Sequence, residues 1–255
     1  MTKASSSFAG RVVLVVSLVL WLTPRSTVAQ KIEPKQLKRA VERSEKSAKV
    51  LKTIAELPHS GIPRELVDKA HAVGVFPHVV TAKLFFEQLS LGYGVISRRN
   101  PGGWSLPAFY VLSGAGFELN LGGEEAADII LLFMSEKALS WIQKGRVHMK
   151  GEKRPTTGLV EPMTDVQRTQ LANANIIAYA LYKGILVGTG LGGGFFKNFS
   201  INPDNNLNKP LYGVKANEIL GGKEIDAQSV PAGINAFQQA LREHYDRPPV
   251  SQPPN

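Results

Sequence analysis

The fold is decided by a stretch that opens with AVGVFPHVVTAKLFFEQLSLGYGVISRRN at residues 72–100. It continues with AFYVL (108–112), AGFELNLG (115–122) and DIILLFM (128–134). These short apolar or alternating runs are separated by glycines, which is typical of strands joined by tight connections. We therefore expect an antiparallel, glycine-rich β-sheet or a barrel-like core.

Outward from this stretch, helical patterns surround a second series of strands. IIAYALYKG (176–184) and ILVGTGLGGGFF (185–196) indicate further strands, followed by a polar, turn-rich loop at 202–210. Short helices are expected at 63–71, at 135–143 with Ser135 as N-cap, at 214–220 ending at Gly221, and at 231–244. The predicted fold class is α+β, with peripheral helices around the sheet.

Residues 34–57 predict one N-terminal amphipathic helix, because Pro34 lies in its first turn and no Gly or Pro interrupts it. Its expected apolar stripe consists of Leu37, Val41, Ala48, Leu51 and Ala55. The candidate lipid-binding residues are the cations of this helix: Lys35, Lys38, Arg39, Arg43, Lys46, Lys49 and Lys52. An ordinary surface helix with a solvated outer face would show the same pattern.

The first 29 residues have the character of a secretory signal peptide. Lys3, Arg11 and Arg25 are their only charges, and the apolar run of 11 residues at 12–22 is interrupted only by Ser17. A membrane-spanning helix needs about 20 residues, so a permanent anchor is the weaker alternative. We expect cleavage after Ala29, a single domain at 30–246, and a proline-rich disordered tail at 247–255. The product would be periplasmic or secreted.

Composition limits the partners. The chain has no cysteine, so no disulfide can stabilise the exported product. Its formal charge is +9, and residues 31–56 alone hold eight Lys or Arg against four Glu. This local excess favours an anionic partner. Because export argues against nucleic acid, anionic lipid or an acidic protein remains.

One glycine pattern and one Asp/Asn pattern resemble known ligand sites but lack the neighbouring sequence that those sites need. Gly188, Gly190 and Gly193 match G-x-G-x-x-G, but no helix pattern follows, so we do not expect a dinucleotide. The run Asp204, Asn206, Asn208 has the spacing that opens a calcium loop, but lysines replace the Gly and Glu which that loop requires. Turn-capping Asx side chains are the simpler interpretation.

No catalytic set is visible. The five histidines include no i, i+4 pair, and Ser105 has no recognisable base nearby in the sequence. We therefore expect no enzyme activity, no cofactor and no metal, although a triad assembled only by the fold would escape this test.

The segment GGWSLPAFY at 102–110 resembles the SYLF domain, a family of lipid- and actin-binding domains. The resemblance continues through IPRELVDKAHAVGVFP (62–77), DIILLFMSEKAL (128–139), NIIAYALYKGILVGTGLGGG (175–194) and LYGVKANEILGG (211–222). It covers residues 36–222 and favours the bacterial branch of the family. The chain departs from the family at 83–89, where it has KLFFEQL and many members carry a glycine-rich strand.

The resemblance implies binding of phosphoinositides or other anionic lipids at a membrane surface, partly through a basic N-terminal helix. Residues 35–52 match that helix in character. Actin bundling does not transfer readily to an exported protein. The alternative is a structural or protein-interaction domain of the cell envelope without lipid affinity.

Overall fold

A computed structural model describes residues 32–57, 61–84, 87–117, 125–144, 147–150, 174–190 and 196–246. The predicted signal peptide and proline-rich tail lie outside these residues. The helices are α1 (Pro34–Ala55), α2 (Arg64–Lys69), α3 (Glu136–Gln143), α5 (Asn205–Tyr212), α6 (Ala216–Leu220) and α7 (Ala236–Tyr245), with a 3₁₀ turn, η1 (Ala227–Ser229). The strands are β1 (Ala72–Leu84), β2 (Glu87–Asn100), β3 (Gly103–Trp104), β4 (Ala108–Phe117), β5 (Glu125–Phe133), β6 (Val147–Lys150), β7 (Ile176–Tyr182), β8 (Ile185–Gly190) and β9 (Phe196–Pro203).

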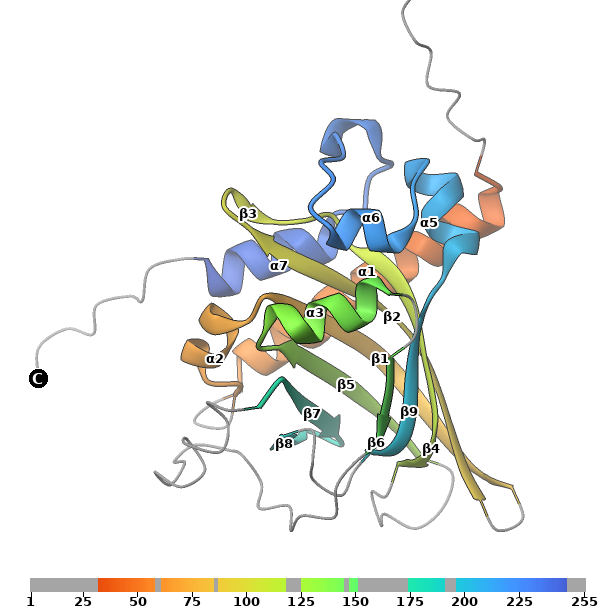
Figure 1. Cartoon of the computed structure of the whole chain (residues 1–255), viewed down its shortest axis with the longest axis vertical. Helices are drawn as coiled ribbons and strands as arrows, with labels where there is room; N and C mark the ends of the chain where they lie inside the picture. Colours follow the sequence, from red (N-terminus) through yellow and green to blue (C-terminus); the bar gives the residue numbers. More distant parts are fainter. Residues whose placement is uncertain are drawn as a thin grey trace, which may run out of the picture.

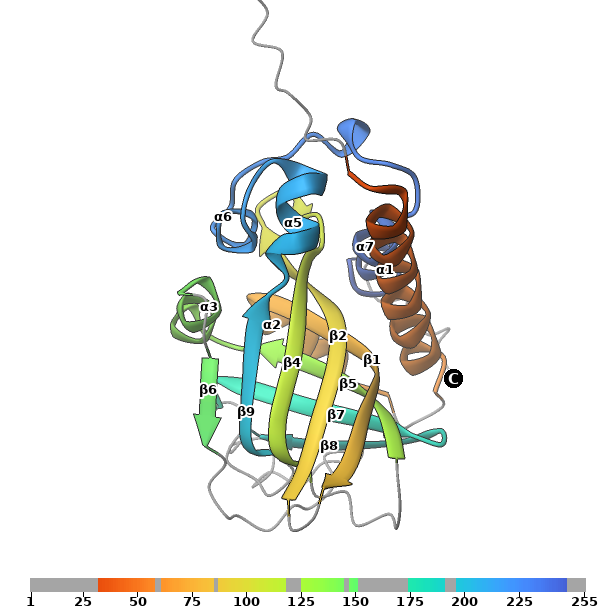
Figure 2. The same cartoon turned by 90° about the vertical axis from the view of Figure 1, so that its right-hand side faces the viewer.

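The strands form one antiparallel sheet in the order β6-β9-β4-β2-β1-β5-β7-β8, with β3 attached to β2. Figure 1 shows the sheet coiling strongly, and Figure 2 shows β5, β7 and β8 crossing behind the upright β9, β4 and β2. Among the described residues β6 and β8 do not pair with each other, so the sheet stays open. The predicted α+β class with an antiparallel sheet is confirmed.

A bulge in β1 bends the sheet. Pro77 has no backbone N–H to contribute to the ladder, and His78 takes a left-handed conformation with φ 51°. The N–H of His78 is satisfied by the carboxylate of Asp128 on β5, at 2.8 Å. The pairing of β1 with β2 shifts between Val75 and Val80, so the side chains beyond the bulge change faces.

Two hydrophobic clusters lie on the two faces of the sheet. One fills the concave side between the upright and crossing strands and is closed by α3 and α6; it contains Phe76, Tyr110 and Phe133. The other lies under α1, α2 and α7 and contains Val75, Val95 and Phe237. The burial of both clusters stabilises the fold without disulfides.

The helix predicted at 34–57 is confirmed as α1, but its predicted apolar stripe is displaced. The buried line is Ala40, Ser44, Ser47, Val50, Leu51 and Ile54, while Ala55 is exposed and Leu37, Val41 and Ala48 are only half-buried. The two buried serines explain the difference, because an apolar pattern does not include them. Ser44 Oγ donates to the carbonyl of Ile234 at 2.6 Å and accepts from the N–H of Phe237 at 3.1 Å. A side chain of α1 therefore caps the first turn of α7.

The prediction of a polar loop at 202–210 is wrong, because β9 continues to Pro203 and α5 begins at Asn205. Tertiary partners stabilise this helix despite its poor local propensity. Pro210 cannot bond the carbonyl of Asn206, and the side chain of Gln36 on α1 donates to that carbonyl instead, at 3.2 Å.

The remaining helix predictions hold with shifted boundaries. Ser135 caps α3 by accepting from the N–H of Ala138 at 3.1 Å. The last helix begins at Ala236 rather than Pro231, because Gly233 has φ +86°, which a helix cannot contain.

Candidate functional site: the outer face of α1

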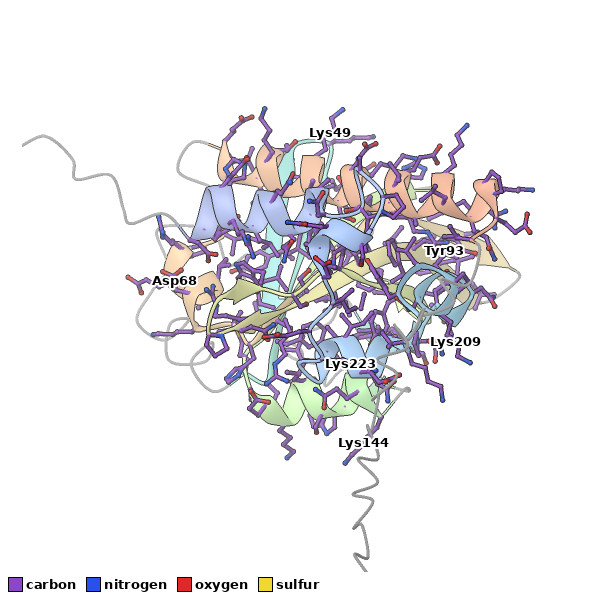
Figure 3. The ribbon with its side chains drawn as sticks, turned by 90° about the horizontal axis from the view of Figure 1, so that it is seen from above. Lys49, Asp68, Tyr93, Lys144, Lys209 and Lys223 are labelled. Atoms are coloured by element: carbon purple, nitrogen blue, oxygen red, sulfur yellow. The ribbon has the colours of Figure 1, made fainter. Side chains whose placement is uncertain are left out.

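The cations of α1 divide by exposure into six that face solvent and one that does not. The exposed side chains are Lys35, Lys38, Arg39, Lys46, Lys49 and Lys52. Lys38 and Lys52 lie near Glu42 and Glu56, at 4.0 and 3.9 Å. Within the part of the chain that the structure describes, the other four have no ion-pair partner. Figure 3 shows Lys49 pointing outward, away from the sheet.

Arg43 differs from the other six. Its Nη1 lies 2.7 Å from Oδ2 of Asp204, and both side chains are largely buried, at 16% and 12% exposure. Its guanidinium also stacks on the ring of Tyr93, 4.5 Å from the centroid. Arg43 therefore joins α1 to β2 and to the start of α5. Sequence reasoning missed both partners, which are far from Arg43 in the chain, so no local signal could have found them.

The docked helix leaves no free apolar stripe for a membrane. Ala40, Leu51 and Ile54 are 0–1% exposed, and Leu37 and Val41 pack against the same cluster. Figure 3 shows α1 beside α7, above the sheet. In this state α1 can attract a partner only through charge.

The loops at one end of the sheet form an open cleft of about 700 Å³. Two of its cations bond to the chain itself: Arg98 donates to the carbonyl of Leu220 at 2.9 Å, and Lys223 lies 3.0 Å from Glu218. The backbone N–H of Lys215 and the ammonium of Lys223 hold the pKa of Glu218 below its usual value. These bonds order the loops.

The other sequence candidates take structural roles. Ser105 Oγ accepts from the N–H of Arg98 and donates to the carbonyl of Leu106, both at 2.9 Å. Gly188 and Gly190 pair with residues of β7, so they belong to strand β8 and not to a phosphate-binding loop. Gly193 lies outside the described residues. His71 contacts Glu136 at 2.9 Å. The described residues contain no cluster of three metal-ligating side chains.

Asp204, Asn206 and Asn208 do not converge on a shared point. Asp204 pairs with Arg43, Asn206 is exposed, and Asn208 is completely buried against β4. The side chain of Asn208 accepts from the N–H of Phe109 at 2.8 Å and donates to its carbonyl at 2.9 Å. Asn208 therefore clamps α5 to the sheet.

A family model described as "Ysc84: Las17-binding protein actin regulator" matches residues 113–244, just over half of the 255 residues. The chain belongs to the Ysc84 family. No curated protein matches it.

Membership in the Ysc84 family confirms the predicted SYLF resemblance and supports a binding role in general. The matched residues run from β4 to α7. The seven predicted cations lie before this region, so the match does not bear on them. No helix within the described residues is long and apolar enough to span a bilayer.

Proposed function

We propose that this protein is a non-enzymatic module that binds anionic lipid surfaces peripherally through the outer face of α1. The observation that carries the proposal is the exposure of six cations on a helix whose opposite side is packed on the core. Three glutamates, Glu42, Glu45 and Glu56, share the outer face, so a net positive charge remains. A flat surface bearing phosphate groups complements this face.

The expected affinity is modest and depends on salt. Each Lys or Arg near an anionic surface contributes about 1 kcal/mol, so four contacts give a dissociation constant of ~1 mM. Exposed charges are screened over about 8 to 10 Å at ordinary ionic strength. Binding should therefore weaken as salt is added.

The first prediction is that the purified protein co-sediments with anionic liposomes at low salt, and not with neutral liposomes or at high salt. A variant carrying Lys35→Glu, Arg39→Glu, Lys46→Glu and Lys49→Glu should lose this binding. The loss of about 4 kcal/mol corresponds to roughly a thousandfold in affinity.

A matched control separates the location of charge from net charge. Four other lysines are exposed: Lys69 on α2, Lys137 on α3, Lys144 directly after α3, and Lys209 on α5. Figure 3 shows Lys144 on the other side of the molecule from Lys49, with Lys209 at one side between them. Replacing these four by Glu gives the same net charge as the α1 variant and should leave most of the binding. Equal loss in both variants would contradict an α1 site, and no binding by the native protein would favour an envelope interaction domain.

We also propose that residues 1–29 direct export and are removed, leaving a domain at 30–246 with a proline-rich tail. The protein would then be periplasmic or secreted and membrane-associated only peripherally. The basic n-region and the apolar run of 11 residues support this proposal. The second prediction is that intact-mass analysis of the exported protein gives a chain beginning at Gln30. A mass that retains residues 1–29 on membrane-bound protein would instead identify an anchor.

A further inference from the structure

Large hydrophobic side chains are exposed at only a few places in the described residues, and most of them gather on two strands. They are Val80 (41% exposed), Leu89 (42%), Leu91 (45%), Tyr93 (45%) and Ile185 (65%). Leu89, Leu91 and Tyr93 alternate along β2 and share one face, and Val80 on β1 is the direct partner of Leu91. We call Val80, Leu89, Leu91 and Tyr93 the strand patch.

The strand patch continues the face of the sheet that α1 covers. Val95 is two residues beyond Tyr93 on β2, pairs with Val75, and is fully buried in the cluster under α1. Figure 2 shows no helix in front of the lower halves of β2 and β4. Beyond the edge of α1, apolar side chains thus remain uncovered by any described element.

The backbone of these strands is not available for strand addition. β1 pairs with β2 and β5, and β2 pairs with β1 and β4. Whatever covers the strand patch must therefore contact its side chains from the face of the sheet. This geometry excludes an added β-strand as the occupant.

Cations border the strand patch on the α1 side. Arg43 stacks on Tyr93. Arg39 and Lys46, four residues before and three residues after it, lie on the same edge of the helix, and both are exposed. Apolar side chains next to a row of cations complement the boundary of an anionic bilayer, where phosphates lie above acyl chains. A tyrosine at the rim suits the same boundary because its ring is amphipathic.

We propose that the strand patch inserts into the headgroup–acyl boundary of an anionic bilayer, with Arg39 and Lys46 at the phosphates. This inference rests on the proposed function and deepens it. Because the stripe of α1 is packed on the core, the apolar contact comes from the sheet, and the helix need not undock. One face then supplies charge attraction and apolar contact together.

The absence of cysteine makes the third prediction directly measurable, because a single introduced cysteine can be labelled uniquely. Leu91→Cys, labelled with an environment-sensitive dye, should show a blue shift and a several-fold rise in emission with anionic vesicles. Brominated acyl chains should quench this emission. Ile185→Cys is the matched control, since Ile185 is an exposed apolar residue on β8 outside the strand patch. Its label should not respond.

An unlabelled variant tests how much the strand patch contributes to the free energy of binding. Leu89→Ser with Leu91→Ser should bind anionic liposomes about tenfold more weakly, because two partly inserted apolar side chains are lost. Both residues are exposed, so the variant should keep its native circular dichroism.

The outcomes separate the two proposals. If the protein sediments with anionic liposomes but the Leu91 label stays aqueous, the inference fails and binding by charge survives. If nothing sediments, the proposed function fails. If the emission of the label shifts to the blue without lipid as protein concentration rises, a second copy of the chain covers the strand patch, and the inference is overturned.

Discussion

Gly94→Ala should destabilise the protein by about 3 kcal/mol, in the upper range for an overpacked core. A Cβ at this position would collide with the carbonyl oxygen of Val75 and come within 2.6 Å of the Phe76 ring. The first obstacle is backbone of the neighbouring strand, so no side-chain rotation can relieve it. β1 and β2 would have to separate where Tyr93 and α1 meet.

Urea unfolding followed by circular dichroism measures this effect, and Gly102→Ala provides its control. A Cβ at Gly102 meets nothing within 4 Å, so that variant should stay within about 0.5 kcal/mol of the native protein. Equal stability of the two variants would contradict the close approach of β1 and β2.

Asn208→Ala should also cost about 3 kcal/mol, because it leaves a buried N–H without a partner and removes two further hydrogen bonds. Asn208 is fully buried, and its side chain bonds both backbone groups of Phe109 and the carbonyl of Asp204. Most of the cost comes from the N–H of Phe109, because this buried donor bonds Oδ1 of Asn208 and would be left without an acceptor.

The contrast with Asn206→Ala makes this prediction specific. Asn206 lies on the same helix, is exposed, and uses its backbone carbonyl rather than its side chain to bond Gln36. Its replacement should change the free energy of unfolding by no more than about 0.5 kcal/mol. Similar losses for both variants, measured by chemical unfolding, would show that Asn208 does not clamp α5 to β4.

The local elements were largely predictable because their signals are local. Alternating apolar residues and glycines predict the strands of residues 72–134, Ser135 predicts the start of α3, and Pro34 the start of α1. The same motifs, in order, carry the resemblance to the family that the chain belongs to. The cations of α1 are also evident in the sequence.

Two of the failures share one physical reason, which is that a distant partner overrides a local preference. Ser44 is buried in α1 because it caps α7, and the polar run at 202–210 becomes helical because Arg43, Phe109 and Gln36 satisfy its groups. No periodicity within either segment encodes those partners.

The sequence by itself determined the α+β class, the strand series, the basic helix and the family. The tertiary structure alone decided which surfaces are free. Packing against the sheet buries the line from Ala40 to Ile54, and the ion pair with Asp204 withdraws Arg43 from solvent. Leu89 and Leu91 alternate like core residues, yet they stay exposed because α1 does not reach over them, and Tyr93 at the edge of α1 is covered only in part, by Arg43. Exposure depends on what lies across the sheet, and that depends on contacts between segments far apart in the chain.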